Sequence, residues 1–200
     1  MALQKNIAFF DFDGTITSKD SMLALAKYDA GKLNYYAKML SIAPSLIAFK
    51  AGLLDAHKAK EKFLQTFFGG LSTESFASIC NEFNNDVLPS IIKKDAMKAI
   101  AKHQQENTVV VVVSASAENW LKPWCTKNNL TLLGTRLLEK NGTITGKILG
   151  NNCNGKEKVS RINEIFNLTD FEKIYAYGDS SGDKEMLSIA SNPHYRLFKK

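Results

Sequence analysis

Five consecutive valines, Val109 to Val113, constrain the fold of this 200-residue chain more than any other feature. β-Branched side chains favour extended strands, and a short apolar run is typical of a buried strand rather than a helix. No polar side chain alternates with the valines, so both faces of the strand must be covered. The pattern predicts a strand in a parallel sheet that carries helices on both faces.

Three further apolar runs predict neighbouring strands, at residues 6–12 and 173–179 and, with a weaker signal, at 130–135. Helical patterns lie between them, for example at residues 156–166 and 183–190. Strands that alternate with helices are typical of a doubly wound α/β fold with a parallel central sheet. Hydrophobic residues make up 44% of the chain, which is enough for such a core.

One segment departs from this alternation, because the chain between the first strand and the valine strand shows one helical pattern after another. This stretch is far longer than a connection between two strands requires. We therefore predict an α/β core domain, residues 1–16 and 89–200, with residues 17–88 inserted as a helical domain. Later in the chain, Asn141-Gly142 predicts a β-hairpin over residues 136–149.

The charged residues and cysteines narrow the class of protein. The net charge is +6, but the lysines are scattered and no basic block interleaved with aromatic residues occurs, so we expect no nucleic-acid partner. Attraction of a small anionic substrate fits this charge equally well. Cys80, Cys125 and Cys153 are too widely separated for a disulfide framework or a zinc motif. Together with an N-terminal apolar run too short for a signal peptide, they predict a cytoplasmic protein.

Polar side chains follow three of the predicted strands. Asp11 and Asp13 come after the first strand, Ser114 after the valine strand, and Asp179 and Asp183 after the strand at 173–179. In a doubly wound sheet, ligands bind beyond the carboxyl ends of the strands. We therefore expect four carboxylates and a hydroxyl group to converge at one edge of the sheet.

This set of side chains suits phosphoryl transfer. Oxygen ligands in this number suit Mg²⁺, which keeps water and substrate phosphate as its other ligands. One carboxylate can attack phosphorus to form an aspartyl phosphate, and a second can protonate the leaving oxygen and then activate water. A hydroxyl group and a lysine can hold the transferring oxygens, and Lys156 or Lys158 precedes a late helical pattern at a suitable place.

The order of these residues resembles the four motifs of haloacid-dehalogenase-type phosphatases. The motifs are Asp-x-Asp-Gly-Thr at 11–15, a serine after the second strand, a downstream lysine, and Gly-Asp-Ser-x-x-Asp at 178–183. The resemblance spans the whole chain and implies a Rossmann-like α/β core. The inserted helices resemble the cap of subfamily IB, the phosphoserine-phosphatase-like branch. The segments VSASAENWLKPW (113–124) and CNGKEKV (153–159) are similar to a group that contains uncharacterised phosphatases and a phosphatidylglycerophosphate phosphatase.

The resemblance implies a role for each acid. Asp11 would be the nucleophile and a Mg²⁺ ligand. Asp13 would be the general acid and base, with its backbone carbonyl on the metal. Asp179 would be a further Mg²⁺ ligand, and Asp183 would support the water shell of the metal.

The resemblance also implies which residues bind the substrate. Thr15 and Ser114 would bind the phosphoryl group together with the lysine of the third motif. In the family, apolar residues follow this lysine one, four and seven positions later. Lys158 has this pattern and Lys156 does not, so we expect Lys158 to be the phosphate-binding lysine. In the cap, Asp20 would correspond to the acid that binds the amino group of the substrate in the family.

These features predict a Mg²⁺-dependent phosphatase that hydrolyses a small organic phosphate monoester. The cap segment contains no arginine to clamp a carboxylate, and Ala115 stands where phosphoserine-phosphatase relatives commonly have glycine, which weakens the case for phosphoserine itself. A lipid phosphate, similar to phosphatidylglycerophosphate, is the alternative substrate. A receiver-type signalling domain and a non-catalytic phosphate-binding module are more remote alternatives.

Residues 39–54 of the inserted segment form an apolar stripe at helical spacing. The stripe consists of Met39, Ile42, Leu46, Phe49 and Leu53. The segment is shorter than the ~20 residues of a membrane span and contains a proline and a lysine. We expect the stripe to pack the core of the inserted domain, with contact to a lipid or an anionic membrane surface as the alternative.

Overall fold

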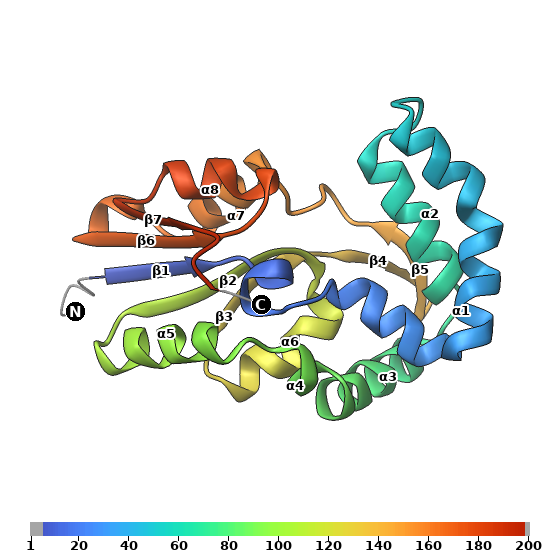
Figure 1. Ribbon diagram of the computed structural model, residues 1–200, viewed down its shortest axis with the longest axis horizontal. Helices are drawn as coiled ribbons and strands as arrows, with labels where there is room; N and C mark the ends of the chain where they lie inside the picture. Colours follow the sequence, from blue (N-terminus) through green and yellow to red (C-terminus); the bar gives the residue numbers. More distant parts are fainter. Residues whose placement is uncertain (1–5, 199–200) are drawn as a thin grey trace.

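A five-stranded parallel sheet forms the centre of the molecule in the computed structural model, which describes residues 6–198 (Figure 1). Its strands lie in the order β3-β2-β1-β6-β7, and each neighbouring pair is parallel. The carboxyl ends of the strands therefore meet along one edge of the sheet. The strands are β1 Asn6–Phe10, β2 Val109–Ala117, β3 Thr131–Thr135, β6 Lys173–Gly178 and β7 Asn192–Tyr195.

Both faces of the sheet are buried, which explains the uninterrupted run of valines. Val110 and Val112 belong to one hydrophobic cluster, whereas Val111 and Val113 belong to another on the opposite face. Strand β1 divides its apolar side chains between the same two clusters. Because successive side chains of a strand point to opposite faces, apolar residues are favoured at every position where both faces are covered.

Helices cover the two faces of the sheet in pairs (Figure 1). Helices α5 (Lys94–Gln105) and α6 (Glu118–Lys127) contribute to the first cluster, and α7 (Lys156–Ile165) and α8 (Lys184–Ser188) contribute to the second. Trp120 and Trp124 of α6 are buried in the core. The doubly wound α/β fold with a parallel central sheet is therefore confirmed.

Three of the helices that lie between β1 and β2 in the sequence stand beyond the carboxyl ends of the strands (Figure 1). They are α1 (Ser21–Lys50), α2 (Ala56–Phe68) and α3 (Thr73–Asp86), and the short α4 (Leu88–Ile91) leads back to the core. The chain of α1 changes direction at Gly31, which has φ 69° and ψ 163°. Glycine adopts this conformation readily because it has no Cβ.

A β-hairpin joins the inserted helices from a distant part of the sequence. Strands β4 (Leu137–Lys140) and β5 (Thr143–Ile148) are antiparallel, which confirms the predicted hairpin. The N–H of Gly70 donates to the carbonyl of Ile144 at 2.9 Å, and the N–H of Ile144 donates to the carbonyl of Leu71 at 2.9 Å. The hairpin therefore packs on the inserted helices although it follows β3. The division into residues 1–16 with 89–200 and residues 17–88 stays a prediction.

The apolar stripe of the inserted segment is only partly buried. Ile42 is fully buried, and Met39 and Leu46 are half-buried against the main hydrophobic cluster, so these three residues pack a core as expected, in a cluster that also contains side chains of β1 and β2. The expectation is wrong for Phe49 and Leu53, which are exposed. Helix α1 therefore buries the middle of the stripe and leaves its C-terminal end in solvent.

Two features of the fold were not predicted. One is strand β7, and the other is the length of β2, which runs past Ser114 to Ala117 with a change of register against β3 after Val113. In the described part of the chain, no helix combines the length and the apolar character that crossing a membrane requires.

Candidate active site

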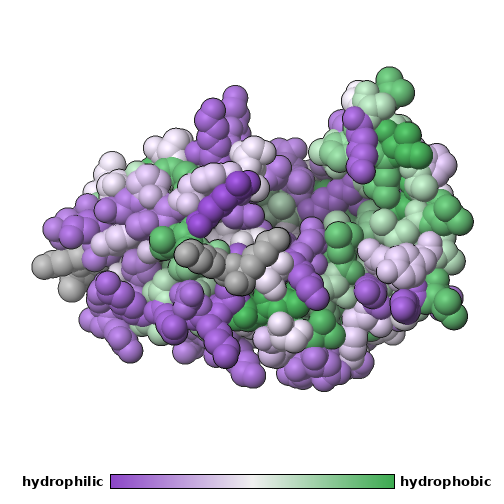
Figure 2. Space-filling view, in the orientation of Figure 1, coloured by the Kyte–Doolittle hydropathy of each residue, from purple (hydrophilic) through white to green (hydrophobic). Residues whose placement is uncertain are grey.

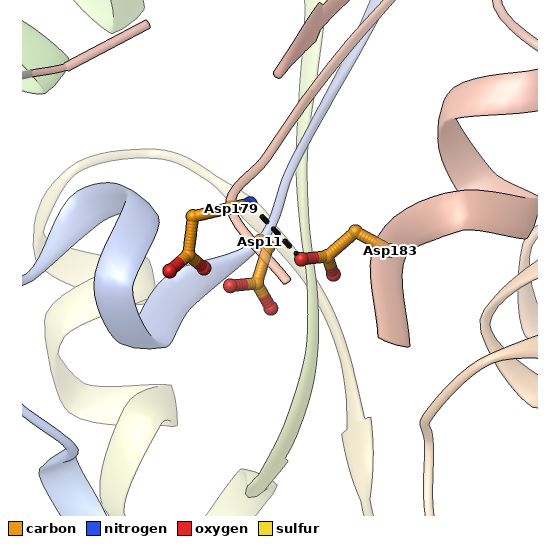
Figure 3. Close-up of side chains that lie close together, drawn as sticks. All are labelled: Asp11, Asp179 and Asp183. Carbon is orange, nitrogen blue, oxygen red and sulfur yellow. Dashed lines mark hydrogen bonds between the residues drawn. The ribbon is translucent and has the colours of Figure 1, made fainter. Parts of the chain in front are cut away.

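Three carboxylates converge at the carboxyl edge of the sheet and form an acid cluster of Asp11, Asp179 and Asp183. Asp11 follows β1, and Asp179 and Asp183 follow β6. One carboxylate oxygen of each lies within 4.8 Å of the others. Figure 3 shows the carboxylate of Asp11 between the other two. The N–H of Asp11 donates to the carbonyl of Tyr177 at 2.9 Å, so the pairing of β1 with β6 fixes its position.

Lys158 is buried against this acid cluster. Its Nζ donates to Oδ1 of Asp11 at 2.5 Å, to Oδ1 of Asp183 at 2.6 Å and to the carbonyl of Val113 at 2.8 Å. Lys156 is exposed at the start of α7. All three hydrogens of the Lys158 ammonium group thus have an acceptor, and the structure brings this lysine rather than Lys156 to the acids.

Asp183 is held on both of its carboxylate oxygens. Oδ1 accepts from Lys158, while Oδ2 accepts from the N–H of Asp179 at 3.1 Å, drawn as a dashed line in Figure 3, and from the N–H and hydroxyl of Ser180, each at 2.9 Å. A carboxylate with this many donors has a fixed orientation. Asp183 therefore positions Lys158 and the loop after β6.

Asp13 is aimed away from the acid cluster, toward the start of α1. Its Oδ1 accepts from the N–H of Ser21 at 2.7 Å, and its Oδ2 accepts from the hydroxyl of Ser116 at 2.5 Å. The two serine hydroxyls lie 3.1 Å apart, and Nε1 of Trp120 donates to Oγ of Ser21 at 3.1 Å. Neither serine was predicted from the sequence. The position of Ser116, two residues after Ser114, was the one available signal.

The other predicted residues lie around the same site. Oγ1 of Thr15 donates to Oδ1 of Asp179 at 3.4 Å. Ser114 is buried, and its Oγ accepts from the backbone N–H two residues later at 3.0 Å. Asp20 is exposed and caps α1 by accepting from the N–H of Leu23 at 2.9 Å. Asp20 lies on the inserted side of the site, and Thr15 and Ser114 lie on the core side.

Burial dominates the electrostatics of these acids. It raises the pKa of Asp11 to about 7, although the ammonium group of Lys158 acts in the opposite direction. It raises the pKa of Asp13 to about 6 and also raises the pKa of Asp179. Burial acts on Asp183 too, but Lys158 and the hydrogen bonds outweigh it and the pKa is lowered. The site disfavours its own negative charge, so a bound cation would stabilise the ionised carboxylates.

A cavity of about 510 Å³ opens onto Asp11 between the sheet and the inserted helices. Its polar end includes Ser114 and Lys158. The opposite wall is apolar and is formed by side chains of α1 and α2, among them Met39, Leu46, Phe49 and Phe63. The cavity therefore combines a charged end with an apolar wall.

Lys60 of α2 connects the inserted helices to the core across this cavity. Its Nζ donates to the carbonyl of Ala115 at 2.5 Å and to Oδ1 of Asn152 at 2.7 Å. Burial lowers the pKa of Lys60 to about 8. This cationic contact was not assigned a role from the sequence.

Known proteins that resemble this chain include hydrolases, among them a probable phosphatase. The family model of the haloacid dehalogenase-like hydrolases matches residues 8–188. The chain belongs to this family. Protein CicA of Caulobacter vibrioides is 36% identical over 194 residues, which cover 95% of this chain and 85% of CicA. A Mycobacterium tuberculosis protein named "Probable phosphatase" is 32% identical over 194 residues, which cover 94% of this chain and 67% of that protein.

A solved structure shares the fold of this haloacid dehalogenase-like hydrolase. It is a phospho-aspartyl intermediate analogue of phosphoserine phosphatase, with a TM-score of 0.61 and 23% sequence identity, covering 95% of this chain and 85% of that chain. The family and its phosphatase relatives identify the chain as a phosphatase. A receiver-type signalling domain, the remote alternative, belongs to a different family.

The acid cluster of this haloacid dehalogenase-like hydrolase fits a small divalent cation. Its donors are carboxylate oxygens, which Mg²⁺ prefers. The carboxylates of the cluster outnumber the one ammonium group, that of Lys158, which forms ion pairs with Asp11 and Asp183. Because both oxygens of Asp183 already accept hydrogen bonds, Asp11 and Asp179 would be the better direct ligands.

Gly14 lets the first motif of this haloacid dehalogenase-like hydrolase approach Asp179. Its φ is +86°, a left-handed conformation that side chains disfavour. A Cβ at this position would lie 2.7 Å from Cγ of Asp179. Glycine is therefore required here both by the backbone and by the neighbouring carboxylate.

We expect Gly14→Ala to lower phosphate release and to lower the free energy of unfolding by about 1–3 kcal/mol, because the backbone is strained and Asp179 is displaced. Gly52→Ala is the matched control, since Gly52 has φ +74° but a Cβ added there would meet no atom within 4 Å. It should lose stability through strain alone and keep its activity. Chemical denaturation measures the free energy of unfolding of both variants, and steady-state assays measure their phosphate release. Equal activity in both would contradict the role of Gly14.

Proposed function

We propose that this phosphatase hydrolyses a small organic phosphate monoester with Mg²⁺, through an aspartyl phosphate formed on Asp11. The observation that supports this most directly is the acid cluster beside Lys158, at the carboxyl edge of the sheet and open to a cavity. Asp11 is the one member of the cluster that lies between the other two. It is also the member that directly follows a buried central strand.

In the first step, a carboxylate oxygen of Asp11 bonds to phosphorus. The bond between phosphorus and the substrate's bridging oxygen breaks, and its electron pair stays with that oxygen. Asp13 donates a proton to the oxygen, so the alcohol leaves in neutral form. The raised pKa of Asp13, about 6, is consistent with a carboxyl group that carries a proton for part of the cycle.

In the second step, Asp13 accepts a proton from water, and the water oxygen attacks the phosphorus of the aspartyl phosphate. The bond between phosphorus and the Asp11 oxygen breaks, which releases phosphate and restores the carboxylate. Ser21 and Ser116 hold the Asp13 carboxylate in one orientation for both proton transfers. The same group thus acts as acid and then as base.

The phosphoryl oxygens would be held by Thr15, Ser114 and Lys158. Because all three hydrogens of the Lys158 ammonium group already have acceptors, contact with a phosphoryl oxygen must replace one of them. Bond formation at Asp11 reduces the charge on that carboxylate and so favours this exchange. Mg²⁺, held by Asp11, the backbone carbonyl of Asp13 and Asp179, would supply positive charge that screens the substrate phosphate from the acids.

A lipid phosphate is the second candidate substrate, and the apolar wall of the cavity favours it. Met39, Leu46 and Phe49 of α1 face the polar end of the cavity. Residues 17–88 contain no arginine that could bind a substrate carboxylate in bidentate fashion. Both features fit an organic group that is apolar better than they fit phosphoserine.

A substrate panel tests these proposals. Phosphate release from phosphoserine, histidinol phosphate, an alkyl phosphate and a micellar lipid phosphate would be compared at equal enzyme concentration. We expect a higher kcat/KM for substrates with an uncharged organic group than for phosphoserine. A clear preference for phosphoserine would contradict the interpretation of the apolar wall.

Chelation tests the metal. We expect excess EDTA to lower phosphate release by about 100-fold or more, because the uncompensated acid cluster would repel the substrate phosphate. Mg²⁺ in excess of the chelator should restore the rate. Circular dichroism in EDTA is the control, and it should show that the fold is retained. Unchanged activity in EDTA would contradict the metal-dependent mechanism.

A further inference from the structure

The outer side of α1 exposes several large apolar side chains, which we call the outer apolar face. Its members are Leu33, Tyr36, Leu40 and Ile47 of α1, together with Leu53 in the turn that follows the helix. Leu33 is 86% exposed, Leu40 76%, Ile47 67% and Leu53 83%. Figure 2 shows hydrophobic surface gathered over α1 and the turn that leads into α2. Contiguous exposed apolar surface of this kind marks an interaction site.

The four members of this face that belong to α1 form one line along the helix. Leu33, Tyr36, Leu40 and Ile47 follow one another at spacings of three, four and seven residues, which places them on a single stripe. At 1.5 Å per residue the stripe from Leu33 to Ile47 is about 21 Å long. Ile42, on another side of the helix, is buried. Helix α1 is therefore apolar on its packed side and on its solvent side.

The charges around this face favour an anionic partner. Between Asp29 and Asp55 the chain carries three lysines, Lys32, Lys38 and Lys50, and no acidic residue. Lys32 and Lys50 are exposed. An apolar stripe flanked by lysines is the pattern of a helix that lies in the interface of a bilayer.

A second copy of this chain matches the face less well. A two-fold contact would bring the same lysines of both copies together, with no acid in the segment to pair with them. A bilayer with anionic lipids instead offers an apolar interior for the leucines and negative headgroups for the lysines.

We propose that the outer apolar face binds the surface of an anionic membrane, with α1 lying in the plane of the interface. Met39, Leu46 and Phe49, on the other side of the same helix, line the cavity, so α1 would separate the cavity from the bilayer by one helix. The contact involves none of the residues assigned to the chemistry above. It is independent of the proposed reaction.

Vesicle sedimentation tests the proposal with the full chain, in EDTA and without substrate, so that a failure of the proposed phosphatase chemistry leaves the measurement intact. We expect the protein to pellet with vesicles of phosphatidylcholine and phosphatidylglycerol and much less with phosphatidylcholine alone. The triple variant L33S/L40S/I47S should lower the partition coefficient by about tenfold or more, because it removes the inserted apolar side chains. K32E/K50E should remove the preference for anionic vesicles.

The matched control is L149S/I165S/L197S, which replaces three exposed apolar side chains elsewhere on the molecule. It should bind vesicles within about twofold of the unmodified protein, since these residues lie outside the face. Thermal melting of each variant checks that the fold is retained. Absence of vesicle binding, or equal losses in both triple variants, would overturn the proposal. So would a dimer in sedimentation velocity that L33S/L40S/I47S converts to a monomer, because a second copy would then cover the face.

Discussion

We expect Asp11→Asn to abolish phosphate release, lowering kcat by about 10⁴-fold or more, while the fold is retained. The asparagine amide has nearly the same shape as the carboxylate, but it should not form the aspartyl phosphate. Lys158 should keep its bonds to Asp183 and to the carbonyl of Val113. Steady-state assays in Mg²⁺ measure the loss of kcat, and thermal melting shows whether the fold is retained.

Two further measurements sharpen the result. Asp170→Asn is the matched control, because Asp170 is exposed and lies outside the site, so its activity should be unchanged. A beryllium fluoride adduct, which mimics the phosphorylated carboxylate, should form on Asp11 in the unmodified protein. Appreciable activity in Asp11→Asn, or an adduct on Asp179, would refute the assignment of the nucleophile.

Asp13→Asn should lower kcat by about 10²–10⁴-fold, because proton transfer to the leaving oxygen and from water is lost. The loss in the first step should depend on the leaving group. An alkyl phosphate needs the proton, whereas p-nitrophenolate leaves without it. With p-nitrophenyl phosphate the variant should therefore show a burst of nitrophenolate followed by slow turnover, since the aspartyl phosphate accumulates when water is not activated.

Ser116→Ala is the companion variant, because it removes one hydrogen bond to Asp13 but leaves the carboxyl group. It should lose much less activity than Asp13→Asn and show no burst. Equal losses for both kinds of substrate in Asp13→Asn, without a burst, would indicate that Asp13 has a structural role only.

The central strands could be predicted because their sequences admit one interpretation. The valine run and the run before Asp11 are apolar at every position, and such runs occur where a sheet is covered on both faces. Strand β7 could not be predicted, because Asn192–Tyr195 contains Pro193, which is disfavoured inside a strand. Its place at the edge of the sheet explains why proline is tolerated there.

The acids of the site could be predicted because they stand at strand ends. Asp11, Asp179 and Asp183 follow strands, so the topology alone brings them together. Ser21 could not be found this way, because its contact with Asp13 depends on where α1 begins after the turn. Ser116 could not be found either, because β2 was expected to end at Ser114 but runs on to Ala117.

The choice of Lys158 over Lys156 rested on three apolar positions that were expected to face the sheet. Ile162 is buried and Val159 is half-buried, but Ile165 is 58% exposed. The pattern therefore selected the lysine that reaches the acids, although one of its three supports is wrong.

The outer apolar face illustrates a different limit. One apolar stripe was predicted for residues 39–54, whereas Leu33, Leu40 and Ile47 form a second apolar side that was not predicted. A helix that is apolar on two sides gives no periodic signal for which side is packed. The position of α2 determines which side of α1 is packed.

Lys60 ties α2 to the core at the edge of the cavity by two hydrogen bonds. Any motion that separates α2 from the sheet must break its hydrogen bonds to Ala115 and Asn152 and return the ammonium group to water. If a ligand enters or leaves by such a motion, breaking these two bonds adds to the barrier for exchange. Because the pKa of Lys60 is lowered to about 8, the amino group loses its charge above that pH, and its hydrogen bonds to Ala115 and Asn152 weaken. Ligand exchange would then become faster in alkaline solution, at a point in the molecule where no bond of the substrate is made or broken.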